Sequence, residues 1–186
     1  AEVAKMDQMA EIRKQTGTEA HAVMQELVEL YANKKGNIGD IQRRASGLFT
    51  KAQFEILAVN VKALVKQVND VQKEIDPEAK ATFLTEQLVH SPSRNIAGSL
   101  DFLVLFSDNT AAVYDWKFVS PTNQKYVQWK NGRYQVVEDM FENKMDTYNI
   151  QLGEYKQILI DDYGVSMVRQ SRIVPAYIRY KFVEGK

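Results

Sequence analysis

The chain has 186 residues, of which 45% are hydrophobic and 26% are charged, the composition of a globular protein with one domain and a sizeable core. It contains no cysteine and no apolar run of roughly 18 residues, which excludes disulfides, thiolate zinc sites, iron–sulfur clusters and a membrane-spanning helix. The 24 basic residues balance 24 acidic ones, so a polyanionic partner must be met by a local patch of charge.

The N-terminal part of the chain is predicted to be helical. Residues 1–15 form a helical lead-in that is too polar for a signal peptide, so we expect an intracellular protein, cytoplasmic by default. Thr16 and Glu19 fit a Thr-x-x-Glu capping box, which predicts that a new helix begins there and continues to a stop at Gly36. His21 lies in the first turn of this helix. A lone histidine is more often a packing or surface residue than a ligand, unless acidic groups lie nearby.

A long amphipathic helix and a strand follow. Residues 37–50 predict a loop or a short irregular helix, and residues 54–75 carry apolar side chains at helical spacing, which indicates packing on a core. Residues 81–90 alternate well enough for a strand, and residues 91–95 form a turn. Within this strand, Glu86 is either an exposed residue or the third acid of a site.

The segment from Gly98 to Lys117 carries the strongest functional signal. Asp101 precedes an unbroken apolar run, residues 102–106, and Asp115 ends the next apolar stretch after a polar turn. Carboxylates at the ends of buried strands are costly unless they are paired or bind a metal. Asp115 and Lys117 are two residues apart, so their side chains project from one face of the strand. We therefore expect all three side chains to be functional.

The turn between these two strands decides whether the aspartates can meet. A two-residue loop of Asp108 and Asn109 would pair Asp101 with Trp116, on the opposite face from Asp115. Chelation of one ion by both acids therefore requires a loop of odd length or a β-bulge.

A second hairpin is predicted within the inserted segment 118–138, where Asn131 and Gly132 suit a two-residue type I′ turn. This turn would place Trp129 opposite Tyr134. The hairpin strands carry basic residues and no acid, with aromatic residues between them, which suits nucleic acid through phosphate contact and stacking. The alternative is an ordinary surface hairpin whose aromatics pack on the domain. The side chains that would contact a substrate are Lys125, Lys130, Arg133 and Trp129.

A helix and a strand end the chain. Residues 139–162 predict a helix on which Gln151 and Tyr155, four residues apart, share a face. Residues 173–183 predict a strand, and Pro175 places it at an edge of the sheet or at a bulge because proline cannot donate to the ladder. The order of the elements, without a repeat or a linker, predicts an α/β fold around a small sheet.

These elements and motifs resemble the PD-(D/E)XK nuclease superfamily and, within it, the RecB-like exonuclease branch. The resemblance covers residues 17 to about 160. It implies a single nuclease domain over residues 1–186 with a restriction-endonuclease-like core, in which helices flank a small mixed β-sheet that carries an inserted β-hairpin. The matching motifs are Gly17-Thr-x-x-His21, Glu86, Gly98-Ser-x-Asp101, Asp115-x-Lys117 and Gln151-x-x-x-Tyr155.

The resemblance also implies the chemistry of the site. One or two Mg²⁺ or Mn²⁺ ions would be bound by His21, Asp101, Asp115, the main-chain carbonyl of Trp116 and, as an additional candidate, Glu86. Lys117 would act with Asp101 and Asp115 in catalysis by positioning or activating the attacking water. Gln151 and Tyr155 would shape the site and contact the substrate. Hard carboxylate oxygens suit these ions, and the histidine biases the site toward Mn²⁺.

The expected function is a metal-dependent deoxyribonuclease, an exonuclease rather than an endonuclease. Its partner would be DNA, with RNA as an alternative, and no membrane is involved. The chain would belong to a larger replication, recombination or phage protein or complex. The subgroup of RecB-like nucleases that holds an iron–sulfur cluster is excluded because cysteine is absent. The alternative from another class is a catalytically inactive nucleic-acid-binding or assembly module that retains the nuclease fold.

Overall fold

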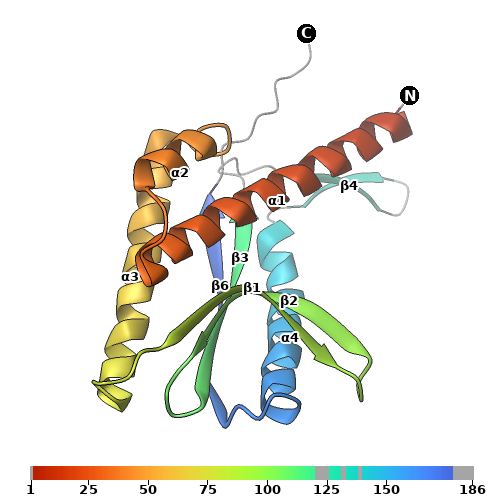
Figure 1. Cartoon of the computed structure of the whole chain (residues 1–186). Helices are drawn as coiled ribbons and strands as arrows, with labels where there is room; N and C mark the ends of the chain where they lie inside the picture. Colours follow the sequence, from red (N-terminus) through yellow and green to blue (C-terminus); the bar gives the residue numbers. More distant parts are fainter. Residues whose placement is uncertain (1, 120–125, 131–132, 138–139, 178–186) are drawn as a thin grey trace.

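A four-stranded mixed sheet with the strand order β1-β2-β3-β6 forms the centre of the molecule (Figure 1). The computed structural model describes the backbone of residues 2–119, 126–130, 133–137 and 140–177 and the side chains of residues 11, 14–118 and 145–176. Three antiparallel strands are followed, after α4, by a fourth that pairs in parallel with β3. The four strands are β1 (Thr82–Ser91), β2 (Ile96–Leu105), β3 (Thr110–Val119) and β6 (Met167–Tyr177).

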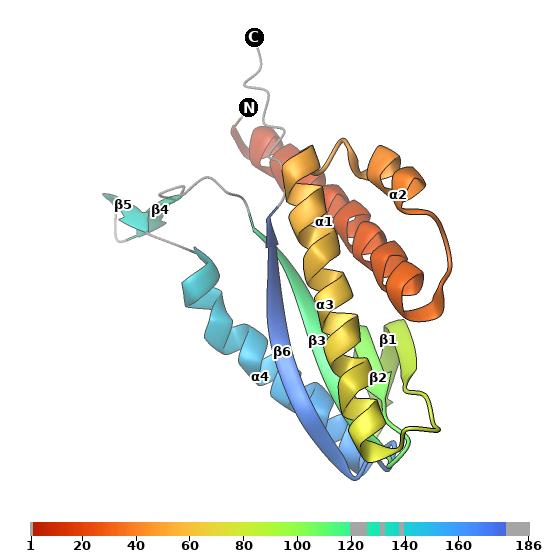
Figure 2. The same cartoon turned by 90° about the vertical axis from the view of Figure 1, so that its left-hand side faces the viewer.

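Helices cover both faces of this sheet, as the predicted α/β fold requires (Figure 2). One face carries α1 (Glu2–Asn33), α2 (Ile38–Ala45) and α3 (Lys51–Ile75), and the other carries α4 (Met140–Asp161). No helix in the described part of the chain is long and apolar enough to cross a membrane.

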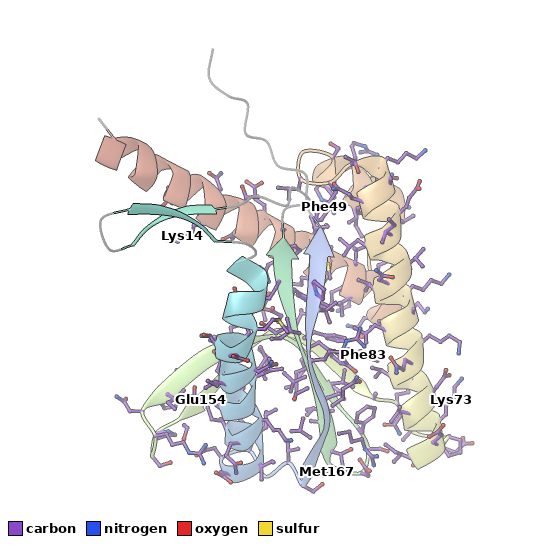
Figure 3. The ribbon with its side chains drawn as sticks, turned by 180° about the vertical axis from the view of Figure 1, so that it is seen from behind. Lys14, Phe49, Lys73, Phe83, Glu154 and Met167 are labelled. Atoms are coloured by element: carbon purple, nitrogen blue, oxygen red, sulfur yellow. The ribbon has the colours of Figure 1, made fainter. Side chains whose placement is uncertain are left out.

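Two hydrophobic cores fill the spaces between these layers. Figure 3 shows the side chains between α3 and the sheet, Phe83 among them. Each core arises because the two faces of the sheet present alternate residues of β2 and β3. The core on the side of α1, α2 and α3 includes Leu27, Phe54, Phe102, Tyr114 and Trp116. The core on the side of α4 includes Leu103, Ala111, Val113, Ile158 and Leu159.

α1 is one continuous helix, so the predicted start of a new helix at Thr16 is wrong. The Thr18 hydroxyl donates to the Lys14 carbonyl at 3.0 Å, and the Gln15 amide donates to the Glu19 carboxylate at 3.3 Å. Both are contacts between residues four apart inside a helix. Glu19 is therefore engaged within the helix rather than in a capping box.

Two other elements begin earlier than predicted. α3 begins at Lys51 because Thr50 caps it in a reciprocal capping box with Gln53. β6 begins at Met167, six residues before the predicted strand, because its parallel pairing with β3 starts there. Its edge position, expected from Pro175, is confirmed, and residues 178–183 of the predicted strand lie outside the described residues.

The loop between β2 and β3 has three residues, which meets the condition set from the sequence, a loop of odd length or a β-bulge. Phe106 and Thr110 pair across it, with the Phe106 N–H donating to the Thr110 carbonyl at 2.9 Å. Asn109 ends the loop in the left-handed region, at φ 64°, which asparagine adopts more readily than most residues. The register of the two strands, continued by one residue, then places Asp101 opposite Asp115 on one face.

β1 and β2 bend together at the level of Asp101. Leu100 and Leu103 belong to the same core, on the α4 side, although residues three apart in a regular strand point to opposite faces. Glu86 lies at the level of Asp101 in the register and has φ 49°, a conformation that costs a residue with a Cβ about 1–2 kcal/mol. The carboxylates of Glu86 and Asp101 therefore lie at the bend, where the alternation of side chains between the two faces of the sheet is interrupted.

The inserted segment contains the predicted hairpin. β4 (Tyr126–Lys130) and β5 (Arg133–Val137) pair antiparallel, and Trp129 lies opposite Tyr134 as predicted. The Asn131–Gly132 turn and Lys125 lie outside the described residues. So do the side chains of the other predicted substrate contacts in this segment, Lys130, Arg133 and Trp129.

Candidate metal centre

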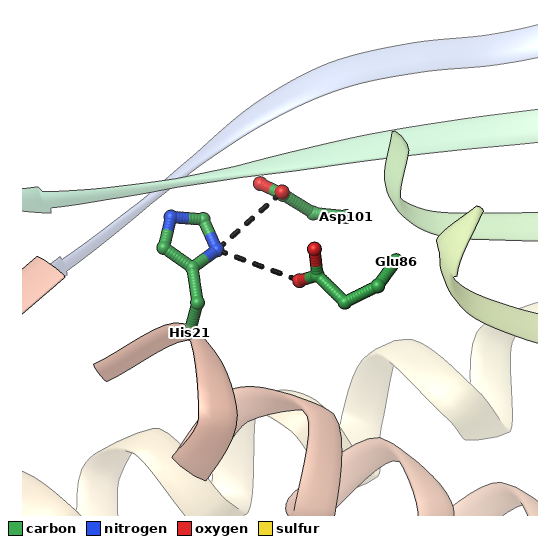
Figure 4. A group of neighbouring side chains, drawn as sticks. All are labelled: His21, Glu86 and Asp101. Carbon is green, nitrogen blue, oxygen red and sulfur yellow. Dashed lines mark ion pairs between the residues drawn. The ribbon is translucent and has the colours of Figure 1, made fainter. Parts of the chain in front are cut away.

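Three side chains with metal-binding groups converge where α1 passes the bend in β1 and β2 (Figure 4). His21 comes from α1, Glu86 from β1 and Asp101 from β2, and one ligand atom of each lies within 4.8 Å of the others. His21 Nδ1 is 3.4 Å from Asp101 Oδ1 and 3.8 Å from Glu86 Oε1. His21 thus lies beside acidic groups, and this is the condition under which a histidine is expected from the sequence to be a ligand.

Asp115 and Lys117 extend this cluster along β3. Asp115 lies opposite Asp101 when the β2–β3 register is continued by one residue, and its charge acts on the Asp101 carboxyl. Lys117 Nζ lies 2.8 Å from Asp115 Oδ2. The Trp116 N–H donates to Asp101 Oδ2 at 2.7 Å, while its indole is buried in the core on the α1 side. The ligand role of the Trp116 carbonyl stays a prediction. The structure therefore brings His21, Glu86 and Asp101 together, and it places Asp115 and Lys117 beside them on β3.

The environment of Asp101 favours a bound cation. Burial raises the pKa of Asp101 to about 8, assisted by the hydrogen bond and the charge of Asp115 and by the charge of Glu86, whereas the Trp116 N–H lowers it. In the metal-free protein, a proton on Asp101 relieves the repulsion between its carboxyl group and those of Asp115 and Glu86. A divalent cation would relieve this repulsion more strongly.

The surroundings of His21 favour its neutral form, the form that can bind a metal. Burial lowers the pKa of His21, and the charge of Lys117 adds to this effect, while the charges of Glu86 and Asp115 oppose it. A neutral imidazole has a lone pair for a metal ion, whereas a protonated one does not. One imidazole nitrogen with several carboxylate oxygens is a donor set that fits Mg²⁺ or Mn²⁺.

α4 forms another wall of the site. The Tyr148 ring lies under Lys117, with Nζ 4.4 Å from the ring centroid, a cation–π contact. Gln151 Nε2 donates to Tyr155 Oη at 3.1 Å. Gln151 is exposed and could reach a substrate, whereas Tyr155 is buried and orients it. Sequence reasoning gave Tyr148 no role, although its position three residues before Gln151 on the same helix face was a signal.

The Tyr155 side chain packs directly on Gly98, and a Cβ at that position would overlap the hydroxyl and the ring. We predict that Gly98→Ala lowers the free energy of unfolding by about 1–3 kcal/mol, because the ring is buried and cannot swing away cheaply. Urea denaturation measures the change. Gly153→Ala is the control, since nothing lies within 4 Å of its Cβ, and it should be neutral or stabilising. Equal stability of Gly98→Ala and the wild type would contradict the packing described.

Metal binding should depend on pH through Asp101. The folded protein holds a proton on this group up to about pH 8, while the unfolded chain releases it near pH 4. The metal-free protein should therefore lose stability as pH rises from about 4 to 8, by an amount on the order of a few kcal/mol. Mn²⁺ displaces this proton, so its apparent affinity should rise with pH and level off above about 8. Thermal unfolding between pH 5 and 9, with and without Mn²⁺, measures how the stability of the metal-free protein and the stabilisation by Mn²⁺ change with pH. If neither quantity changed with pH, both expectations would be refuted.

Comparison of the chain with protein-family models, with curated proteins and with solved structures gives no match.

Proposed function

We propose that the protein is a metal-dependent nuclease that hydrolyses phosphodiester bonds of DNA. The observation that carries the proposal is the convergence of His21, Glu86 and Asp101 with the Asp115 and Lys117 pair at one place in the fold. The mixed sheet with helices on both faces supports a restriction-endonuclease-like core.

The residues of the cluster divide into those that hold the ion and those that act on the reacting groups. His21, Glu86, Asp101 and Asp115 would hold a divalent ion, and this ion would lower the pKa of bound water and polarise the phosphate. Lys117 brings a point charge to the cluster, where it can orient water and offset charge that develops on the phosphate. Tyr148 holds this ammonium in place from below.

Gln151 would contact the sugar or phosphate from α4, since its amide is exposed and is anchored by Tyr155. The β4–β5 hairpin, with its basic residues, would extend the contact with the DNA backbone. Preference for an exonuclease over an endonuclease rests on the resemblance to RecB-like exonucleases.

The test is incubation of the protein with linear duplex, circular duplex and single-stranded DNA, and with RNA, in Mn²⁺ and in EDTA. We expect cleavage of linear DNA in Mn²⁺, no cleavage of closed circles and none in EDTA. Cleavage of circles would show an endonuclease. Stabilisation by Mn²⁺ without cleavage of any substrate would overturn the proposal in favour of an inactive binding module.

A further inference from the structure

A cleft of about 600 Å³ opens beside the metal cluster, between α1 and the strands. Neither Lys117 nor Tyr148 lines it, so it is a separate approach to the ligand side chains. The residues of the cleft that matter here are Lys14, Gly17, His21, Gln25, Glu86 and Asp101.

One stripe of α1 forms a wall of this cleft. Lys14, Gly17, His21 and Gln25 follow each other at intervals of three or four residues, so they share a helix face. Figure 3 shows Lys14 on this helix. At 1.5 Å per residue, Lys14 lies about 10 Å from His21 along the helix axis and Gln25 about 6 Å on the other side. A ligand that lies along the stripe would therefore cross the metal cluster.

Gly17 leaves a notch in this wall. A Cβ at Gly17 would meet nothing within 4 Å, so no neighbouring side chain requires a glycine there. Glycine inside a helix costs about 1 kcal/mol relative to alanine. The notch widens the cleft one turn before His21, at the expense of helix stability.

The polar groups of the stripe suit an anionic chain. Lys14 is the cationic side chain among the cleft residues and forms no ion pair within the described part of the chain. The Gln25 amide, likewise, makes no hydrogen bond among the described residues, so it can serve a ligand. Among the residues that the structure describes, no Trp, Tyr or Phe lines the cleft, so these residues offer bases no platform for stacking. Recognition would therefore fall on the sugar–phosphate backbone, which carries no sequence information.

We propose that this cleft takes a single strand of nucleic acid, with the phosphate next to the cleaved one held by Lys14 over Gly17. The proposal rests on the proposed nuclease function. The volume lies in the range of pockets that take small molecules, which suits one or two nucleotides of a single strand.

The test measures binding of a short fluorescent oligothymidylate in Ca²⁺, which takes similar oxygen ligands to Mn²⁺. Gly17→Leu fills the notch and should weaken binding by roughly tenfold or more. Gly153→Leu is the matched control, because this helical glycine on α4 is also surrounded by open space but lies outside the cleft, and it should bind normally. Lys14→Ala should reduce the salt slope by about 0.7, the value for one phosphate contact to a single strand. Lys62→Ala, an exposed lysine on α3 that forms no ion pair within the described residues, should leave the slope unchanged.

The proposal would be overturned if Gly17→Leu bound the oligothymidylate with wild-type affinity. It would also be overturned if Gly17→Leu bound a blunt duplex more weakly than the wild type does but bound the single strand equally well. Thermal unfolding of both leucine variants confirms that they fold. The test is separable from the proposed function, because binding in Ca²⁺ needs no turnover. A wild type that binds the oligonucleotide but cleaves nothing in Mn²⁺ refutes the nuclease and leaves the strand path supported.

Discussion

Asp101→Asn is expected to abolish DNA cleavage, with a loss on the order of 10³-fold or more, because the variant removes the buried carboxylate that would hold the proposed ion between β2 and β3. The same change should make the metal-free protein more stable at pH 8. The new carboxamide would accept the Trp116 N–H through its oxygen and donate to Asp115 through its nitrogen, without a buried charge. The gain should be on the order of a few kcal/mol, because the raised pKa of Asp101 marks an ionised form that the fold disfavours.

Three measurements test this expectation: cleavage of linear DNA in Mn²⁺, urea denaturation at pH 8 in EDTA, and the shift in melting temperature with Mn²⁺. The variant should be inactive, more stable than the wild type and insensitive to Mn²⁺. Asp162→Asn, at an exposed position after α4, is the control and should change none of the three. An Asp101→Asn protein that cleaves DNA, or one that is less stable at pH 8, would remove the basis for a metal centre here.

Lys117→Ala should lower the rate of cleavage by about 10²–10³-fold and leave Mn²⁺ binding largely intact. Lys117 contacts Asp115 through its ammonium group but is not itself a metal ligand. Its expected contribution is a positive charge placed where the reaction develops negative charge, so the loss should appear in kcat rather than in the affinity for metal.

The position of the ammonium matters as much as its charge. Lys117→Arg should not restore the rate, because a planar guanidinium cannot occupy the place of a compact ammonium between Asp115 and the Tyr148 ring. Lys156→Ala, on an exposed part of α4, is the control for loss of one positive charge. Cleavage by Lys117→Ala at the wild-type rate would show that the catalytic assignment is wrong.

Much of the fold and the membership of the cluster could be predicted from the sequence because local patterns determine them. The apolar run after Asp101 predicts a buried strand, and the spacing of Asp115 and Lys117 predicts a shared face. The two aspartates share a face only if the loop has an odd number of residues or a bulge intervenes, and the structure supplies the odd length.

The remaining features depend on contacts that no local pattern reveals. The left-handed conformation of Glu86 is imposed by the bend of two strands, since glutamate has no preference for it. Thr16 and Glu19 satisfy a capping pattern, yet the helix continues because its packing outweighs a weak local signal. Tyr148 and Lys14 gain their positions from the way α4 and α1 pack around the cluster, which spacing alone does not specify.

The three-residue loop between β2 and β3 makes the cluster sensitive to insertions and deletions at a distance. Asp101 lies five residues before Phe106, about 17 Å along an extended strand. The loss of one loop residue would nevertheless turn Trp116 toward the candidate metal site and Asp115 toward the core. Asn109 holds the loop length by donating from its amide to the Gly164 carbonyl at 2.7 Å and by accepting from the Ser166 N–H at 2.9 Å. The number of residues in this remote turn thus decides which side chains face the candidate metal site, although the side chains of the turn itself lie away from it.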